Sequence, residues 1–167
     1  SGGRRLFLRR PRWQQQTDRA VSFIGKFQGL IVPGFRFCYG LPAAIGAWCA
    51  TQDFAEYAGR KVISVSGDGG LGQYLAELTT LVKYNMNLTH VLLHNGELGK
   101  ISKEQRAGEW DVWETDLHNP NFADYATLCG ALGIRVTDVA ELASAMRRAL
   151  EHDGPALLEI MTDAELV

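Results

Sequence analysis

The stretch "SVSGDGGLGQYLAE" at residues 64–77 places Asp68 among four glycines, after an apolar, β-branched run and before a helix-like pattern. Glycines let the backbone approach a phosphate closely, and the free N–H groups at a helix N-terminus favour anions. A carboxylate repels phosphate, so Asp68 fits an anion site only if a divalent cation lies between the two groups. The alternative is that Asp68 simply caps the following helix.

Asn95 supplies the second oxygen ligand that a cation site needs. It follows the apolar run 88–94 and lies 27 positions after Asp68, a spacing that fits one strand–helix–strand unit. Mg²⁺ takes octahedral oxygen coordination and is commonly held by one or two side chains together with ligand phosphates. Asp68, Asn95 and the backbone carbonyl of Glu97 would supply three ligands, and diphosphate oxygens and a water would supply the rest. The pattern therefore favours a metal–diphosphate site.

Strand-like and helix-like segments alternate through the rest of the chain. The hydrophobic patterns predict strands at 61–66, 88–94, 134–136 and 155–161, and helices at 40–55, 71–84, 121–133 and 139–154. Asn121 and Asp138 are expected N-caps, and Gly133 and Gly154 are expected helix ends. This alternation predicts an α/β fold, an open and mostly parallel sheet with helices on both faces. In such sheets ligands bind at the carboxyl ends of the strands, where Asp68 and Asn95 would lie.

Composition limits the class of protein. The chain has 167 residues, a net charge of −2 and three cysteines. The length predicts a core of ordinary size. The small net charge predicts no electrostatic field that attracts nucleic acid or anionic membranes. The few, widely spaced cysteines favour a reducing, cytoplasmic setting. No apolar run reaches the roughly 18 residues that a membrane span needs.

The first 34 residues differ from the rest. They begin with an arginine-rich, acid-free stretch that contains Arg4, Arg5, Arg9, Arg10 and Arg12. We interpret residues 1–34 as an arginine-rich leader, with a transit peptide, a polyphosphate-binding arm or a piece of a longer chain as the alternatives. Residues 35–167 are predicted to form the ligand-binding domain.

The order of these motifs resembles a known family. A G-D-G turn, followed after one helix and one strand by an Asn-Gly loop, is similar to the thiamine-diphosphate motif of the pyruvate oxidase and acetolactate synthase family. "YGLPAAIGA" at 39–47 is similar to the preceding helix, and residues 98–136 and 153–160 are most similar to pyruvate oxidase and quinone-linked pyruvate dehydrogenase. The resemblance covers 39–167 and implies the thiamine-diphosphate-binding (diphosphate-side) domain of a larger enzyme.

The resemblance implies roles for individual residues. Asp68, Asn95 and the carbonyl of Glu97 would bind Mg²⁺. Backbone contacts to the cofactor would come from Gly40, Gly67, Gly69, Gly70, Gly96, Glu97, Leu98 and Gly99. Glu104 falls where pyruvate oxidases carry an active-site carboxylate, with a solvated helix residue as the alternative.

Three positions depart from the family. His94 stands in place of the first of two usual asparagines, and Lys100 stands where oxidases often carry an aromatic residue, which argues against oxidase-type electron transfer. Phe37 aligns with the Met-type residue under the cofactor. In the loop that follows, Asp116 and His118 are either an acid–base pair or turn residues, and Trp110 and Trp113 belong to a mobile or a packed loop.

The implied function is decarboxylation of a small 2-oxo acid such as pyruvate. The cofactor would be thiamine diphosphate with Mg²⁺, and FAD, where the full-length enzyme uses it, would bind another domain. The domain would be inactive without a pyrimidine-binding domain from another subunit of a homodimer or homotetramer. The alternatives are a non-catalytic or regulatory subunit and an acetolactate synthase-type carboligase domain. A generic nucleotide binder ranks last, because Asn87 and Thr89 stand where it would need an acid.

Overall fold

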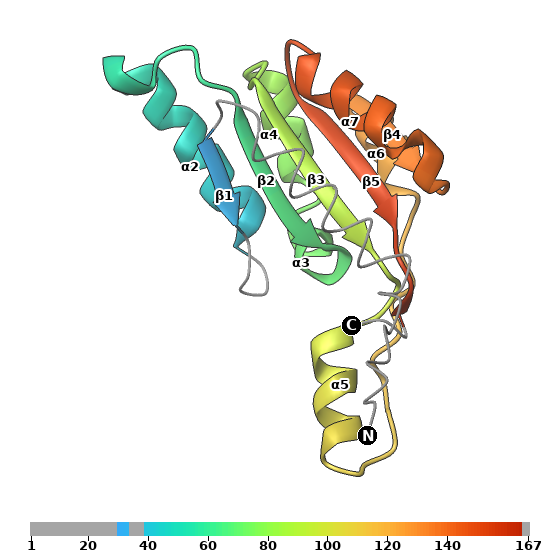
Figure 1. The fold of residues 1–167 in the computed structure, drawn as a ribbon. Coiled ribbons are helices and arrows are strands. Elements are labelled where there is room, and N and C mark those ends of the chain that lie inside the picture. The colour runs from blue at the N-terminus through green and yellow to red at the C-terminus, as the bar shows by residue number, and fades with distance from the viewer. Residues whose placement is uncertain (1–29, 34–38, 165–167) are drawn as a thin grey trace, which may run out of the picture.

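The computed structural model describes residues 30–33 and 39–164. The arginines of the expected leader and the insecurely aligned Phe37 lie outside this part of the chain. The described strands form one five-stranded sheet in the order β1-β2-β3-β5-β4, and every neighbouring pair is parallel (Figure 1). The strands are β1 Leu30–Pro33, β2 Val62–Gly67, β3 Leu88–His94, β4 Leu132–Val136 and β5 Ala156–Met161.

The sheet begins earlier in the chain than the sequence predicts. The sequence predicts a domain that starts at residue 35, but β1 pairs with β2, with Leu30 opposite Val62 and Pro33 opposite Val65. β1 lies at the edge of the sheet, where a proline is tolerated because one side of the strand needs no donor. Residues 30–33 therefore belong to the sheet and not to the leader.

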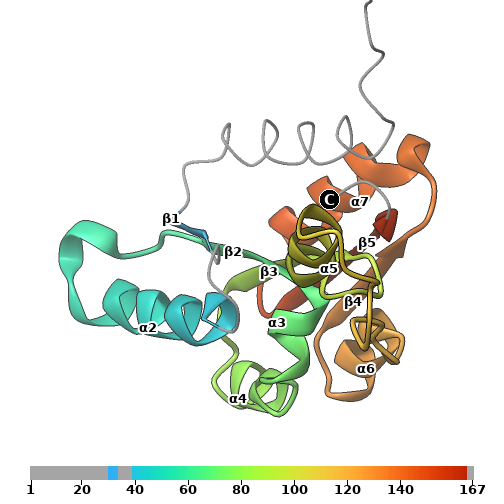
Figure 2. The same cartoon turned by 90° about the horizontal axis from the view of Figure 1, so that it is seen from below.

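Helices cover both faces, as predicted. The α-helices are α2 Gly40–Asp53, α3 Asp68–Gly72, α4 Glu77–Lys83, α5 Gly99–Ala107, α6 Phe122–Leu128 and α7 Leu142–Glu151, with short 3₁₀ helices at Ala55–Tyr57 and Val139–Glu141. Seen from the carboxyl ends of the strands, α2, α4 and α6 lie on one side of the sheet and α7 lies on the other (Figure 2).

The core is divided by the sheet into two apolar clusters. On the α7 face, Met146 and Leu150 pack with Val91 and Leu158, and on the other face Phe122 packs in the same cluster as Leu88, Leu92 and Leu157. Because successive strand residues point to opposite faces, Val91 and Leu92 of β3 serve different clusters. Strands buried on both faces explain the nearly continuous apolar run 88–94.

Three predicted helices differ from those observed. The helix expected at 71–84 is two helices, α3 and α4, separated by turns at residues 73–76. The helix expected to stop at Gly133 already ends at Leu128, and Gly133 lies within β4. The expected N-cap of α6 is confirmed, since Asn121 Oδ1 accepts from Asp124 N at 3.1 Å. Asp138 Oδ1 accepts from Ala140 N at 2.9 Å, but it caps the 3₁₀ helix Val139–Glu141 rather than one long helix, and α7 ends at Glu151, before the expected end at Gly154.

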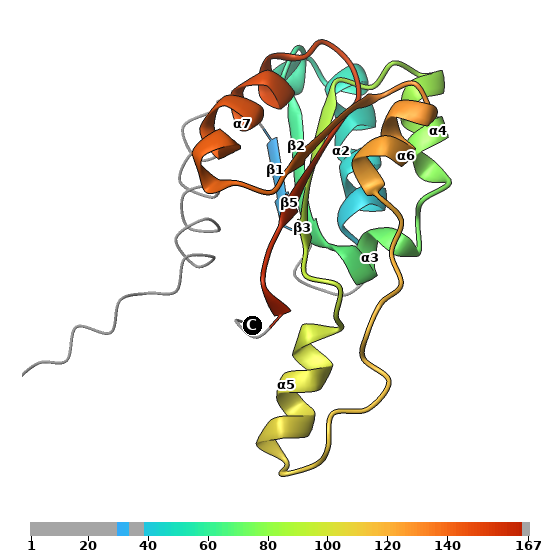
Figure 3. The ribbon, with the colours of Figure 1, turned by 90° about the vertical axis from the view of Figure 1, so that its right-hand side faces the viewer.

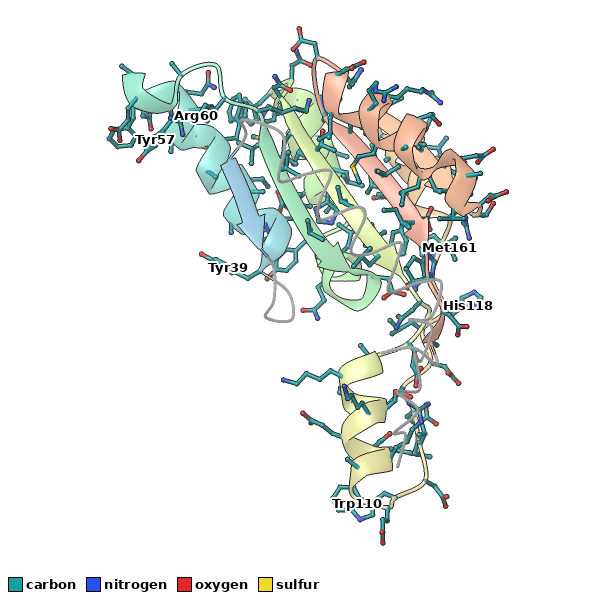
Figure 4. The ribbon with its side chains drawn as sticks, viewed as in Figure 1. Tyr39, Tyr57, Arg60, Trp110, His118 and Met161 are labelled. Atoms are coloured by element: carbon teal, nitrogen blue, oxygen red, sulfur yellow. The ribbon has the colours of Figure 1, made fainter. Side chains whose placement is uncertain are left out.

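Helix α5 and the loop that follows it project from the carboxyl edge of the sheet (Figures 1 and 3). We call residues 99–118 the arm. Trp110 lies at its far end and His118 lies where the chain rejoins the body (Figure 4). In the part of the chain that the structure describes, no helix has the length and apolar character needed to cross a membrane.

Candidate functional site

Asp68 and Asn95 lie at the carboxyl ends of neighbouring strands, as expected. β2 and β3 are parallel and adjacent, and Gly67 at the end of β2 lies opposite Leu93 of β3. Asp68 is the first residue after β2, and Asn95 is the first residue after β3. The spacing of 27 positions therefore brings both side chains to the edge of the sheet where open α/β proteins bind ligands.

Asp68 does not cap the helix that follows it. The N-cap of α3 is Gly67, and Asp68 is the first helical residue. Its carboxylate accepts hydrogen bonds from Gly69 N at 3.0 Å and from Gly96 N at 2.7 Å, so it ties the turn after β2 to the loop after β3. Asp68 is buried, with only 2% of the residue exposed. The capping alternative is thus replaced by a bridge between two loops.

The charge of Asp68 has no Lys or Arg counterpart among the described residues. The nearest basic group is His94, whose Nε2 lies 3.7 Å from Asp68 Oδ2. A buried carboxylate without a cationic partner is costly to desolvate, and a bound cation would offset that cost. This feature fits the divalent cation that the sequence predicts at Asp68.

The loop after β3 has a tight and well-defined conformation. Asn95 Oδ1 accepts from Glu97 N at 3.1 Å, and Gly96 has φ +73°, a left-handed conformation that favours glycine. Two backbone hydrogen bonds attach this loop to the end of the arm, Leu98 N to Thr115 O and Leu117 N to Gly96 O, both at 2.8 Å. The Asn-Gly pair is therefore part of the turn geometry as well as a candidate ligand.

In the turn after β2, the neighbours of Gly69 leave no room for a side chain. A Cβ on Gly69 would lie 2.8 Å from Leu98 Cδ2 and 3.3 Å from Leu117 Cδ1. Gly67 is exposed, and Gly70 is partly buried within α3. Gly40 and Gly99 are buried at the first positions of α2 and α5. These glycines thus lie at the end of β2 and in the first turns of α2, α3 and α5.

The side chain of Glu97 is buried and hydrogen-bonded, so its carboxylate is not a free acid. Its Oε1 accepts from Thr115 Oγ1 at 3.3 Å and from the Arg106 guanidinium at 3.4 Å, and the residue is 8% exposed. The side chain therefore fixes the loop to the arm. This leaves the backbone carbonyl of Glu97 as its candidate ligand, as expected from the sequence.

Glu104 is on the exposed surface of the arm. Its side chain is 70% exposed and lies 4.0 Å from Lys100 Nζ, one helical turn away. In this chain its environment is that of a solvated helix residue. Asp116 and His118 are also exposed, as are Trp110 and Trp113.

The sequence does not reveal two residues near the site, Asn119, which contacts Asp68, and Glu159, which contacts His94. Asn119, in the loop before α6, donates from Nδ2 to Asp68 Oδ2 at 2.8 Å. Glu159 of β5 is fully buried and accepts from His94 Nδ1 at 2.6 Å. A lone acidic residue in the apolar strand "ALLEIM" was a usable signal for Glu159, whereas nothing local distinguishes Asn119. His94 is a hydrogen-bonded structural histidine.

The donor set suits a hard cation. In the described segments no three His, Cys, Asp or Glu side chains gather as a metal site. A cation at this edge would depend on the Asp68 carboxylate with amide and carbonyl oxygens from Asn95 and Glu97. Such oxygen ligands suit Mg²⁺, which usually keeps waters or phosphate oxygens in its remaining positions.

Comparison with known proteins identifies similar chains. The sequence matches the family described as "Thiamine pyrophosphate enzyme, C-terminal TPP binding domain" over residues 34–160. The protein YdaP of Bacillus subtilis (strain 168) is 39% identical over 126 residues, which are 75% of this chain and 21% of YdaP. The mitochondrial acetolactate synthase catalytic subunit of Aspergillus candidus is 34% identical over 129 residues, which are 77% of this chain and 18% of that protein.

A solved structure has the same arrangement of elements. The thiamine diphosphate-dependent 4-hydroxybenzoylformate decarboxylase of Rhodococcus jostii RHA1 matches with a TM-score of 0.68 and 26% sequence identity. The match covers 78% of this chain and 24% of the decarboxylase. The chain thus spans about a fifth of the length of the curated relatives it matches.

Proposed function

The chain belongs to the thiamine pyrophosphate enzyme family as its C-terminal TPP binding domain, and from this premise we propose that it holds thiamine diphosphate through Mg²⁺. The metal ligands in this proposal are Asp68, Asn95 and the carbonyl of Glu97. The observation that carries it is the Asp68 carboxylate, 2% exposed and without a Lys or Arg partner in the described residues, beside Asn95 at the ligand-binding edge.

The chain's own groups have distinct tasks in this proposal. Asp68 neutralises part of the metal charge, and Asn95 and Glu97 add neutral oxygen ligands. The glycine turn at 67–70 and the loop 96–99 present backbone groups to the diphosphate. When bound, thiamine diphosphate supplies the carbanion chemistry at its thiazolium ring, while the protein binds and orients it.

The proposed reaction is decarboxylation of a small 2-oxo acid such as pyruvate, in an enzyme of the pyruvate oxidase or dehydrogenase type. A pyrimidine-binding domain from another subunit would complete the site, and the assembled enzyme would be a homodimer or homotetramer in the cytoplasm. FAD, if the full-length enzyme uses it, would bind outside this domain. Lys100, which replaces an expected aromatic residue, is the feature that argues against an oxidase.

A carboligase is the second candidate function. Several relatives are named acetolactate synthases, including the Aspergillus candidus subunit, and this specific observation favours it. Product analysis separates the two: an acetolactate synthase joins two pyruvate-derived units, whereas a decarboxylating oxidoreductase passes electrons to an acceptor. A non-catalytic subunit would do neither.

Calorimetric titration of the full-length protein with Mg²⁺ and thiamine diphosphate tests the proposed site. We expect Asp68→Asn to weaken Mg²⁺-dependent cofactor binding by roughly 100-fold or more, since a contact ion pair in a protein is worth several kcal/mol. The matched control is Asp138→Asn, because Asp138 caps a 3₁₀ helix after β4, and β4 is separated from β2 by two strands. Unchanged binding in Asp68→Asn would refute the proposed metal site.

A further inference from the structure

A chain of hydrogen-bonded side chains leads from Asp68 into the sheet. Asn119 Nδ2 lies 2.8 Å from Asp68 Oδ2 and 3.1 Å from His94 Nε2. His94 Nδ1 lies 2.6 Å from Glu159 Oε1. The four residues come from α3, the loop before α6, β3 and β5, so the contacts link segments that are far apart in the sequence. We call Asn119, His94 and Glu159 the Asp68 support chain.

The distances determine how the protons are arranged. An asparagine amide nitrogen carries two hydrogens, and here one points to Asp68 and the other to His94 Nε2. Nε2 thus faces the amide donor of Asn119 and Nδ1 faces the Glu159 carboxylate, so each ring nitrogen has one partner. Every link then has one donor and one acceptor. The imidazole and the amide are each held in a single orientation.

Glu159 is the fixed end of the support chain. It is fully buried, its Oε2 accepts from Ala123 N at 3.1 Å, and its Oε1 lies 3.6 Å from the Arg135 guanidinium. Arg135 offsets the charge of this carboxylate. Asp68, at the other end, has no such partner among the described residues. The charge of Glu159 is therefore balanced within the protein, whereas the charge of Asp68 is left for a bound cation.

The same contacts decide which Asp68 oxygen is available. A carboxylate has about four lone-pair directions, two on each oxygen. Oδ2 accepts from both Gly96 N and Asn119 Nδ2, so both of its directions are used. Oδ1 accepts from Gly69 N alone among the hydrogen bonds of the described residues. Oδ1 is therefore the atom with a lone pair left for a metal ion.

We propose that Asn119 and His94 are positioning residues, which fix the rotation of the Asp68 carboxylate so that Oδ1 faces the cation. The inference rests on the proposed function, because it concerns the affinity of that same metal site. Side chains behind a metal ligand commonly change metal affinity 10- to 100-fold when they are removed. This assigns a task to His94, the position at which the sequence departs from the pattern it resembles.

The test is Asn119→Ala in the full-length protein, titrated with Mg²⁺ at saturating thiamine diphosphate. We expect the apparent Kd for Mg²⁺ to rise about 10- to 100-fold. The matched control is Asn121→Ala, two residues away, which removes the N-cap of α6 without touching Asp68. Asn121→Ala should lower Tm while leaving the Kd for Mg²⁺ unchanged. Mn²⁺ bound in place of Mg²⁺ should show an altered electron paramagnetic resonance spectrum in Asn119→Ala and not in the control.

A second variant covers the case in which Asn119→Ala fails to fold. His94→Gln replaces the rigid ring by a flexible side chain that can still reach Asn119 and Glu159, so the protein should fold. Because the orientation of Asn119 is then less fixed, the Kd for Mg²⁺ should still rise, by less than for complete removal of the contact. Equal Mg²⁺ affinity in wild type and both variants would overturn the positioning role alone. Failure of the wild type to bind Mg²⁺ and thiamine diphosphate would overturn the proposed function as well.

Discussion

At the scale of single residues, His90 is a buried polar group whose pKa differs clearly from that of an exposed histidine. It lies in β3 with no exposed surface, and its Nδ1 and Nε2 lie 2.5 Å and 2.9 Å from the hydroxyls of Ser64 and Ser66. One serine can donate and the other can accept, which satisfies a neutral imidazole. Burial lowers the pKa of His90 to about 4.

The lowered pKa of His90 predicts how stability depends on pH. Below about pH 6.5 the unfolded chain takes up a proton at His90 that the folded chain does not bind until about pH 4. We therefore expect His90 to contribute a loss of about 3 kcal/mol in the free energy of unfolding as pH falls through this window, and no loss above it. Urea unfolding at pH 7 and pH 4.5 measures the change.

A substitution isolates the contribution of His90. His90→Asn should lower stability at pH 7 but should show a smaller further loss at pH 4.5 than the wild type. The control is His118→Asn, because His118 is exposed at the base of the arm (Figure 4). An identical loss between the two pH values in wild type and His90→Asn would contradict the prediction.

At the scale of elements, the contact between α6 and β4 depends on a single glycine. A Cβ on Gly133 would lie 1.9 Å from the carbonyl oxygen of Ala123 and 2.6 Å from Thr127 Oγ1, both in α6. The helix backbone can therefore approach the strand only where the strand has no side chain. This is why the glycine that the sequence suggested as a helix end is instead a packing position.

Two glycine-to-alanine substitutions should have opposite effects on stability. Gly133→Ala should lower the free energy of unfolding by about 1–3 kcal/mol or more, because α6 must shift to admit the methyl group. Gly46→Ala, in α2, places its methyl group where no atom lies within 4 Å and should raise it by about 0.5–1 kcal/mol. Thermal unfolding of both variants checks the pair, and a neutral Gly133→Ala would refute the close packing.

At the scale of the whole molecule, the arm is the part that depends least on the core. Within α5 only Gly99 and Ser102 are buried, and Trp110 and Trp113 are each 72% exposed. Its bonds are mostly internal: Gln105 Oε1 accepts from Trp113 N at 3.2 Å, and Gln105 O accepts from Trp110 N at 2.9 Å. The arm is joined to the body mainly through the loop at 96–98 and residues 115–117.

This arrangement predicts that the hydrogen bonds of the arm open locally, without unfolding of the sheet. Amides of residues 101–107 should exchange with deuterium through openings that cost less free energy than global unfolding, whereas amides of the buried strand β3 should require global unfolding. Hydrogen–deuterium exchange with mass spectrometry resolves the two segments. Equal protection in α5 and β3 would show that the arm is part of the cooperative core.

The sequence by itself determined most of the elements and the common location of the two candidate ligands, Asp68 and Asn95. Periodicity predicted four of the strands because apolar runs and alternation are local properties, and the Gly-Asp-Gly turn and Asn-Gly loop carry their own conformational preferences. Adjacent β2 and β3 then bring Asp68 and Asn95 to one edge. The predicted family and fold are confirmed by the match over residues 34–160 and by the decarboxylase structure.

Only the tertiary structure decided what lies behind Asp68. Asn119 is 51 positions from Asp68, and Glu159 is 65 positions from His94, so no local pattern predicts either contact. The contact of Glu159 follows from the strand order, since β5 pairs with β3 and places Glu159 opposite Leu92, two residues before His94 in the same strand. Hydrophobic alternation specifies which residues face a core, but it does not specify which strand is the neighbour. That choice depends on packing across the whole sheet. This packing places Glu159, whose charge Arg135 offsets, at one end of the support chain and Asp68, without a Lys or Arg partner in the described residues, at the other.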